Sequence, residues 1–370
     1  MAQRCVLKLL YASMHVTFNP GPSQLYFTVQ DHVRSAFREN VPSLSHRSKE
    51  FESYFELATT GLRELLGIPQ GFHVFFTGSA TEIWERSIQN LVEDSSVHYV
   101  NGAFSKRYFE IAQQLKKNPV RIAVAAGKGF TDSSQVAGQP EVIALTHNET
   151  STGVSLPSTF INSFRDAYPD SLIVVDAVSS LPYPEFDFTK IDSLFFSVQK
   201  GFGLPAGLGV WIVNDRCIAK SESLLSKGMS IGTYHTLPTL LANSKKNQTP
   251  ETPNALGIYL LGKVVQDMLN RGIRSIRKET EYKAAILYQA LAKHALISPF
   301  VKESSFQSKT VIVADCGTHL KRIADHLSAH HFMAGDGYGE FKKEHLRFAN
   351  FPAHSKEQFE MLVDLLQQIS

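Results

Sequence analysis

The sequence has little that would cross-link the chain or anchor it in a membrane. Its 370 residues include three cysteines, Cys5, Cys217 and Cys316, which lie far apart and form no C-x-x-C pair. This odd, scattered set argues against a disulfide framework and against a structural zinc site. No apolar run approaches the roughly 20 residues that a membrane-spanning helix requires. We therefore expect a protein of the reducing cytoplasm.

Neither sign of charge dominates the chain. The formal net charge is +2, and 19% of the residues are charged. This balance, without any block of like charges, excludes a nucleic-acid-binding arm and a membrane-surface patch. The 14 histidines show no H-E-x-x-H or similar ligand spacing, so we expect no metal. Lys8 interrupts the apolar run near the start, and we expect residues 1–16 to be a leader segment rather than a signal peptide.

Short apolar runs alternate with amphipathic segments along the first two thirds of the chain. Helices are expected over residues 51–67, where Gly67 can end the helix, and over residues 80–91 and 106–116. Strands are expected at residues 73–76, 97–100, 141–145, 172–175, 193–198 and 209–213. Nearly continuous apolar strands separated by helices indicate a mainly parallel sheet that is buried on both faces. The last strand follows a short link, which favours an antiparallel direction.

A polar, proline-bearing stretch at residues 243–254 interrupts this alternation. Beyond it we expect helices at residues 255–271, 275–294, 320–330 and 356–368, and a strand at residues 310–314. The change predicts two domains. The large one covers residues 17–260, and a smaller C-terminal α/β domain covers residues 261–370.

Polar residues follow four of the predicted strands. Ligands of open parallel sheets collect at the carboxyl ends of the strands. The residues at these ends are Thr77-Gly78-Ser79-Ala80-Thr81-Glu82, His147-Asn148-Glu149-Thr150, Asp176 and Gln199-Lys200. A functional site is therefore expected among them.

Each of these groups also has a purely structural explanation. Ser79 and Glu82 fit the S-x-x-E capping box, although the same helix start can bind a phosphate through its free N–H groups. Asp176 could cap a helix, or it could pair with a protonated ring nitrogen, because an unpaired buried carboxylate is costly. Most lysines are solvated surface groups, but Lys200 ends a buried strand against a glycine-rich turn. Burial favours the neutral amine, which can attack a carbonyl.

Taken in order, these motifs resemble the fold-type I pyridoxal-phosphate enzymes, specifically the class V aminotransferases. Within that class the chain is most similar to the phosphoserine aminotransferases, whose S-H-R-G-K-E-F, N-E-T and Q-K motifs correspond to residues 45–51, 148–150 and 199–200. The resemblance extends from Asn19 to Pro352. It implies an α/β fold with a large, mainly parallel seven-stranded sheet domain and a smaller C-terminal domain. It also implies the cofactor pyridoxal 5′-phosphate.

The resemblance assigns roles to individual residues. Lys200 would hold the cofactor covalently and move a proton during the reaction, and Asp176 would keep the ring nitrogen protonated. Phe104 takes the place of the aromatic residue that stacks on the ring, which is usually tryptophan in the family. The other implied cofactor contacts are Ser79, Ala80, Thr81, Thr150 and Gln199.

The resemblance also implies a homodimer with shared active sites. Class V enzymes complete the phosphate site with a threonine from the second subunit, and Thr249 and Thr252 are the candidates here. His46 and Arg47 would meet a phosphate or the side-chain carboxylate of glutamate. Arg347 would bind the substrate α-carboxylate, a task that suits a planar guanidinium.

One segment departs from the phosphoserine aminotransferase pattern. That family usually has a second His-Arg pair for the substrate phosphate, whereas residues 335–343 read G-D-G-Y-G-E-F-K-K. Asp336 and Glu340 would repel a phosphate, while Lys342 or Lys343 could supply the missing charge. We expect transfer of an amino group between L-glutamate and 3-phosphohydroxypyruvate, as in serine biosynthesis. The alternative is an alanine–glyoxylate or serine–pyruvate aminotransferase.

Two other functions share the fold or retain part of the site. A cysteine desulfurase needs a mobile nucleophilic cysteine, and the candidate, Cys316, directly follows a predicted buried strand. A non-enzymatic scaffold with a vestigial site is disfavoured because the lysine, the aspartate and the phosphate-loop residues are all present.

Overall fold

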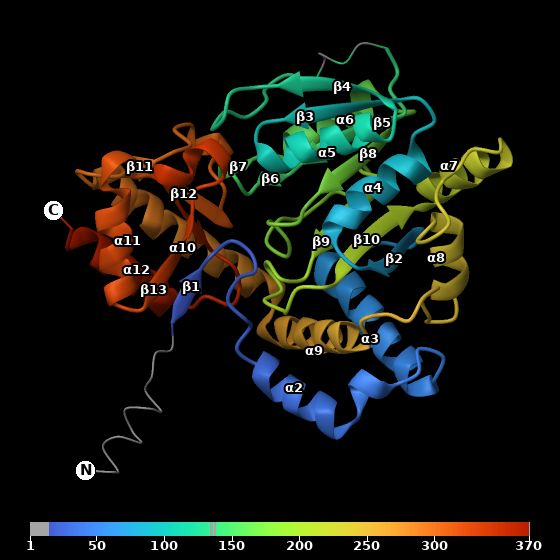
Figure 1. The fold of residues 1–370 in the computed structure, drawn as a ribbon, viewed down its shortest axis with the longest axis horizontal. Coiled ribbons are helices and arrows are strands. Elements are labelled where there is room, and N and C mark those ends of the chain that lie inside the picture. The colour runs from blue at the N-terminus through green and yellow to red at the C-terminus, as the bar shows by residue number, and fades with distance from the viewer. Residues whose placement is uncertain (1–14, 134–135, 137, 370) are drawn as a thin grey trace.

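We describe a computed structural model of the chain, in which residues 15–133, 136 and 138–369 are described. Two sheets organise the molecule, one in a large domain and one in a smaller domain beside it (Figure 1). Most of the predicted leader, and Cys5 with it, lies outside the described residues. Among the helices of the described ranges, none is both long and apolar enough to cross a bilayer.

Seven strands form the large sheet, in the order β2-β10-β9-β8-β5-β3-β4. Their bounds are β2 Phe72–Thr77, β3 Ser95–Val100, β4 Asn118–Ala123, β5 Val142–Thr146, β8 Leu172–Asp176, β9 Ser193–Ser197 and β10 Gly209–Asn214. β10 is antiparallel to both of its neighbours, whereas the other neighbours pair in parallel. The mainly parallel seven-stranded sheet and the antiparallel strand are therefore confirmed. β4, one of the two edge strands, was not predicted because none of its residues is fully buried and the apolar run is missing.

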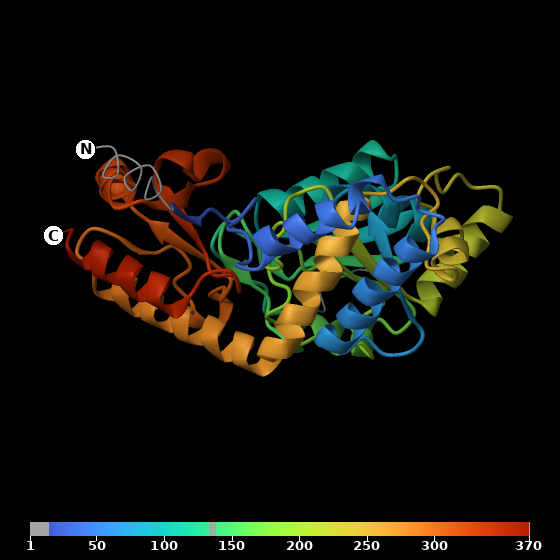
Figure 2. The ribbon, with the colours of Figure 1, turned by 90° about the horizontal axis from the view of Figure 1, so that it is seen from below.

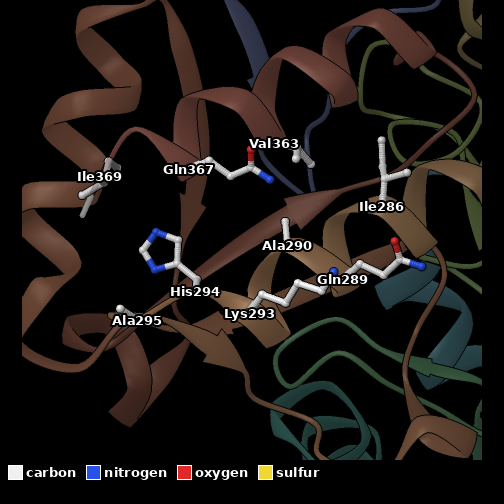
Figure 3. A pocket seen from close by; sticks show the side chains of 9 residues that line it. All are labelled: Ile286, Gln289, Ala290, Lys293, His294, Ala295, Val363, Gln367 and Ile369. Atoms are coloured by element: carbon white, nitrogen blue, oxygen red, sulfur yellow. The ribbon is translucent and has the colours of Figure 1, made fainter.

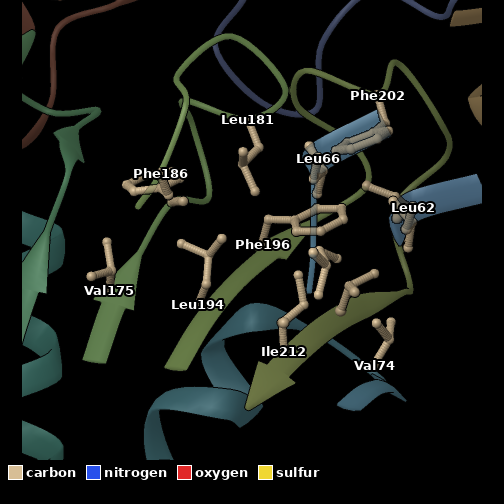
Figure 4. Packing of buried hydrophobic residues seen from close by; sticks show 14 of the residues in the cluster. Leu62, Leu66, Val74, Val175, Leu181, Phe186, Leu194, Phe196, Phe202 and Ile212 are labelled. Atoms are coloured by element: carbon tan, nitrogen blue, oxygen red, sulfur yellow. The ribbon is translucent and has the colours of Figure 1, made fainter. Parts of the chain in front are cut away.

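Side chains of the large sheet alternate between two cores, as the pleat of a strand requires. In β2, Phe76 faces one core and Phe75 the other. Figure 4 shows the first core, where Leu62 lies among side chains of the sheet that include Phe196. The first core packs against α3 (Lys49–Leu66), α6 (Ser158–Ala167) and α9 (Ala255–Arg271); the second packs against α4 (Ala80–Leu91), α5 (Ala103–Gln114), α7 (Asp215–Ser226) and α8 (Leu237–Ser244). The sheet is therefore buried on both faces.

The helix expected over residues 51–67 is α3, and local chemistry sets both of its ends. The Ser48 side chain accepts a hydrogen bond from the backbone N–H of Phe51 and caps the start. Gly67 adopts a φ of 68° and caps the end, a conformation that costs glycine little. Both ends agree with the prediction to within two residues.

Five strands form the small sheet, in the order β1-β13-β14-β12-β11. The elements of this domain are β1 Val16–Phe18, α10 Ile273–Lys293, β11 Ser298–Pro299, β12 Val311–Asp315, α11 Leu320–Ala329, β13 Phe332–Asp336, β14 His345–Ala349 and α12 Lys356–Gln367. β1 pairs in parallel with β13, so a strand from the start of the chain completes the C-terminal sheet. The division into residues 17–260 and 261–370 stays a prediction, and β1 lies at the start of the first range but in the sheet of the second. α9 and α10 follow one another from the large domain to the small one (Figure 2).

Shorter elements complete the described chain. They are α2 Val29–Arg38, β6 Asn148–Glu149, β7 Val154–Ser155 and the single-turn helices Val41–Ser43, Ser304–Phe306, Gly317–His319 and Gly339–Lys343.

Candidate active site

A cavity of about 150 Å³ lies where β2, β5, β8 and β9 end. Eight residues that the sequence singled out line it: Ser79, Ala80, Thr81, Phe104, Thr150, Asp176, Gln199 and Lys200. The carboxyl ends of neighbouring parallel strands meet at one edge of a sheet, which is why residues up to 121 positions apart converge there.

Lys200 is buried beside the chain segment that follows β1. Its Nζ donates a hydrogen bond to the carbonyl oxygen of Pro20 at 2.6 Å. Burial, and then the charge of Arg347, lower the pKa of Lys200 to about 8. A Cβ atom at Gly21 would lie 2.1 Å from Nζ, so only glycine leaves room for the lysine. An appreciable share of the amine is therefore neutral near neutral pH and able to act as a nucleophile.

Asp176 is the last residue of β8, and its carboxylate is 3% exposed. Trp84 Nε1 donates to Oδ2 at 2.8 Å, and the backbone N–H of Val178 donates to Oδ1 at 2.9 Å. Burial raises the pKa of Asp176 to about 7 in spite of these two donors. A cationic ring N–H beside it would supply the positive charge that a buried carboxylate lacks.

The start of α4 faces the same cavity. Ser79 Oγ accepts from the backbone N–H of Glu82 at 3.1 Å, so the predicted capping role is present. The N–H of Ala80 donates to Ser197 Oγ at 2.9 Å. Thr81 is exposed and lines the cavity. The positive end of the helix dipole, with the hydroxyl of Thr81, suits a phosphate group at this end of the cavity.

Phe104 lies in the first turn of α5, and a buried carboxylate holds that turn. Glu149 is fully buried and accepts hydrogen bonds from the N–H of Phe104 at 3.3 Å and of Ser105 at 2.9 Å. The hydroxyl groups of Ser105 and Ser151 donate to it at 2.8 and 2.6 Å. The Phe104 ring lies 5.0 Å from that of Tyr338, measured between centroids. Glu149 therefore positions the aromatic face that borders the cavity.

Two buried polar atoms at the cavity lack a hydrogen-bond partner, namely Asn148 Oδ1 and Gln199 Oε1. Thr150 Oγ1 donates to Ser179 Oγ at 2.8 Å. Unsatisfied buried acceptors are costly, so they point to a ligand with donors of its own. An amine, a buried carboxylate, an aromatic face and a helix start suited to a phosphate together fit pyridoxal 5′-phosphate.

Arg347 lies on β14 and lines a second cavity, of about 550 Å³, that also includes Gly21. Its Nε donates to the carbonyl oxygen of Asp336 at 2.6 Å, and its guanidinium lies 5.4 Å from the ring centroid of Tyr338. Because Gly21 packs against Lys200, this cavity adjoins the first. Lys342 lines it as well.

Four predicted residues lie elsewhere. Arg47 Nη1 donates to Gln248 Oε1 at 2.7 Å and to the carbonyl oxygen of Thr249 at 2.9 Å. Thr249 is buried and its hydroxyl donates to the Glu251 carbonyl oxygen at 2.8 Å, whereas Thr252 is exposed. These residues form a group with the neighbouring His46, and none of them lines the cavity around Lys200 within the same chain.

Several cavity residues were not predicted. They are Trp84, Thr146, Val178 and Ser197, whereas Asn148, which also lines the cavity, belongs to an expected strand-end group but was given no contact of its own. Trp84 follows Ala80 by four positions, so helical spacing places both on the same face of α4, and this signal could have found it. Ser197 is the last residue of β9, but the predicted strand extended to residue 198, so Ser197 was not counted among the polar residues that follow a strand.

Another hollow, of about 440 Å³, lies between α10 and the end of the chain in the small domain (Figure 3). His294 borders it, but its Nε2 already bonds the Leu366 carbonyl oxygen and its Nδ1 accepts from the Leu296 N–H. This hollow is lined by none of the residues described above.

Comparisons with known proteins show the family to which the chain belongs. The model of the family described as Aminotransferase class-V matches residues 15–335. A protein named putative phosphoserine aminotransferase from Mycolicibacterium vanbaalenii is 30% identical over 316 residues, which cover 84% of this chain and 83% of that protein. A phosphoserine aminotransferase from a Nocardioides species is 26% identical over 350 residues, covering 93% and 92% of the two chains.

Solved structures share the fold. The crystal structure of a phosphoserine aminotransferase from Cytophaga hutchinsonii is 51% identical, with a TM-score of 0.94, and covers 96% of this chain and 99% of that one. An alanine–glyoxylate aminotransferase from a Nostoc species is 22% identical, with a TM-score of 0.76 and coverage of 96% and 94%, and shows the fold alone. The chain therefore belongs to the class V aminotransferases and is a transaminase whose cofactor is pyridoxal 5′-phosphate.

Proposed function

We propose that this chain is a phosphoserine aminotransferase that transfers the amino group between L-glutamate and 3-phosphohydroxypyruvate. The observation that carries the proposal is the cavity of about 550 Å³ beside Lys200, where Arg347 and Lys342 present two cations against the single carboxylate of Asp336. A substrate with a carboxylate and a phosphate needs two such partners. The name and the 51% identity of the Cytophaga hutchinsonii structure support the same substrate.

Each residue then has a chemical task. Bound pyridoxal phosphate supplies an electron sink for the electron pair released at the substrate Cα. Lys200, whose pKa of about 8 allows both protonation states, removes a proton from that carbon and returns one. Asp176 would hold the proton on the ring nitrogen of the bound cofactor, and Phe104 would cover one face of its ring. Arg347 orients the substrate through its α-carboxylate.

Lys342 and Lys343 offer a matched pair for testing the substrate phosphate. Lys342 lines the cavity with Arg347 and Lys343 does not, although they are adjacent and both exposed. Lys342→Ala should raise KM for 3-phosphohydroxypyruvate about ten- to a hundredfold, the equivalent of one charge-assisted hydrogen bond, and leave KM for pyruvate unchanged. Lys343→Ala should change neither value.

A panel of amino acceptors with L-glutamate as donor tests the proposal itself. We expect the highest kcat/KM with 3-phosphohydroxypyruvate. Rates no better than those with glyoxylate or pyruvate would contradict it, and strong activity with alanine plus glyoxylate would select the alternative aminotransferase. Cys316 does not favour a desulfurase, because it is 1% exposed and burial raises the pKa of its thiol to about 12.

We also propose a homodimer in which Thr252 completes the phosphate site of the other subunit. Thr249 is buried and its hydroxyl is already bonded, whereas Thr252 is exposed and free to reach a partner. His46 and Arg47 lie beside this segment and would approach the same neighbouring site. Phe27, just before α2, and Phe37, in its last turn, are 69% and 62% exposed and provide apolar surface for the contact.

Mixed dimers test this arrangement. Lys200→Ala and Thr252→Ala subunits should each be impaired alone, but a heterodimer of the two contains one intact site and should recover part of the activity. Recovery in the absence of subunit mixing, or a monomer in sedimentation, would contradict the shared site. The cytoplasm is proposed as the setting because Cys217 and Cys316 are free thiols, and serine biosynthesis is proposed because the product of the proposed reaction is phosphoserine.

A further inference from the structure

His235 is a buried histidine held between two carboxylates, outside the residues assigned to the site so far. It precedes Thr236, the N-cap of α8, and is 1% exposed. Its Nδ1 hydrogen-bonds Glu82 Oε1 at 2.6 Å, whereas its Nε2 lies 2.8 Å from Glu251 Oε2 as an ion pair outside hydrogen-bond geometry. Burial opposes protonation, but the two carboxylates raise the pKa of His235 to about 9. The ring is therefore a cation at neutral pH.

One of these carboxylates holds the turn that faces the cofactor phosphate. Glu82 lies in the first turn of α4, and its second oxygen accepts from the backbone N–H of Gly78 at 2.8 Å. Residues 78–81 form the start of the helix that lines the cavity. Burial acts against ionisation of Glu82, but His235, Gly78 and Arg86 lower its pKa. The charge on His235 therefore supports the position of this turn.

The other carboxylate belongs to the segment that we assign to the partner site, and backbone carbonyl groups of that segment make further contacts. Glu251 directly precedes Thr252, and its carbonyl oxygen accepts from the hydroxyl of Thr249 at 2.8 Å. The Thr249 carbonyl oxygen in turn accepts from Arg47 at 2.9 Å. A continuous set of contacts therefore runs from residues 78–82 through His235 to residues 248–252.

We propose that His235 is a positioning residue that ties the phosphate-binding turn of its own subunit to the Thr252 segment offered to the partner. The part of this proposal that concerns the Thr252 segment rests on the proposed dimer, whereas the contact between His235 and the turn lies within one chain. Without the cation, the half-buried carboxylates of Glu82 and Glu251 would lie as like charges on either side of an uncharged side chain, with Arg86 as the remaining cation beside Glu82. His235 holds a left-handed backbone conformation, with φ 49°, and its ring stacks 3.8 Å from that of Tyr234. This conformation is uncommon outside glycine, which indicates that its surroundings fix the residue.

The test compares the binding of two probes to the apoenzyme, pyridoxal 5′-phosphate and pyridoxal without the phosphate. Both probes can react with Lys200, so the ratio of their dissociation constants isolates the contribution of the phosphate site. The fluorescence of Trp84 at the cavity reports binding. His235→Gln should weaken binding of the phosphorylated probe about tenfold and leave pyridoxal unchanged. His235→Gln/Glu251→Gln should restore most of the loss, because only one of the two like charges remains.

His73→Gln is the matched control, since it breaks a histidine–aspartate pair of 2.8 Å at the far end of β2. It should leave both affinities unchanged. Equal loss for both probes, or no recovery in the double variant, would overturn the proposal. If His235→Gln does not fold, Glu251→Gln is the second variant, since it keeps the His235 ring and its contact with Glu82. Glu251→Gln should lower the preference for the phosphorylated probe severalfold. An unchanged preference would refute the link between the turn and the Thr252 segment. No substrate is used, so an error in the proposed substrate leaves this test intact.

Discussion

Replacement of Trp84 by phenylalanine should raise the pKa of Asp176 without removing the aromatic ring that packs in the core. Trp84 Nε1 donates to Asp176 Oδ2 at 2.8 Å, and the indole also stacks on Tyr108 with 5.9 Å between ring centroids. Phenylalanine keeps an aromatic ring there but removes the donor. A hydrogen bond to a charged acceptor contributes about 1.5–3 kcal/mol, and 1.36 kcal/mol corresponds to one pKa unit. Trp84→Phe should therefore raise the pKa of Asp176 from about 7 to roughly 8–9.

Infrared spectroscopy of the apoenzyme measures this directly. The band of the protonated carboxyl group is followed against pH, and Asp176→Asn identifies which part of it belongs to Asp176. The chain has two tryptophans, and the second provides the control: Trp211 Nε1 donates at 2.9 Å to the neutral hydroxyl of Ser193. Trp211→Phe should lower the free energy of unfolding and leave the midpoint of the Asp176 titration unchanged. An identical midpoint in Trp84→Phe and wild type would refute the reasoning.

Four other substitutions have defined outcomes. Lys200→Ala should abolish turnover and the absorbance band of lysine-bound cofactor, as a visible spectrum of the purified enzyme would report. Gly21→Ala should reduce kcat severely, because the new Cβ would lie 2.1 Å from Lys200 Nζ and the backbone φ is +148°; an active variant in a steady-state assay would contradict this. Glu149→Gln should lower the free energy of unfolding by roughly 2–3 kcal/mol in urea titrations, since an amide N–H₂ would face backbone and hydroxyl donors. The pKa of Asp176 is 3.8 in the unfolded chain and about 7 in the folded protein. The contribution of Asp176 to the free energy of unfolding is therefore fully present below pH 3.8 and is lost as the pH rises towards about 7. The melting temperature of the apoenzyme should therefore fall more between pH 5 and pH 8 in wild type than in Asp176→Asn, and parallel curves would contradict it.

The large domain was largely predictable because its strands are buried on both faces. The apolar runs around Val175 and Phe196 identify strands without any knowledge of their neighbours, and the polar residues that follow them identify the site. Strand order is different, since it depends on contacts between distant segments. β4 lies at an edge of the sheet, where water covers part of its surface, so its sequence lacks the apolar run that identifies the predicted strands.

Residues that act through other residues were the hardest to predict. Lys200 and Asp176 stand next to strand ends, so position alone marks them. Glu149 reaches the start of α5 from 44 positions away and His235 reaches Glu82 from 153 positions away, and a sequence pattern does not reveal which carboxylate meets which donor. Glu149 belongs to the N-E-T motif, yet its role as an anchor for Phe104 required the folded geometry.

The pairing of β1 with β13 bears on how the protein is made. Val16 pairs with Phe332, so the first described strand must wait for synthesis of more than 300 further residues before its sheet can close. The large sheet needs no such delay, since β10 ends at Asn214. On the ribosome, residues 16–18 would therefore remain exposed while the large domain folds behind them. A fragment of residues 261–370 alone would leave an edge of β13 unpaired and open to other chains, and a version that carries residues 15–20 fused to it would not.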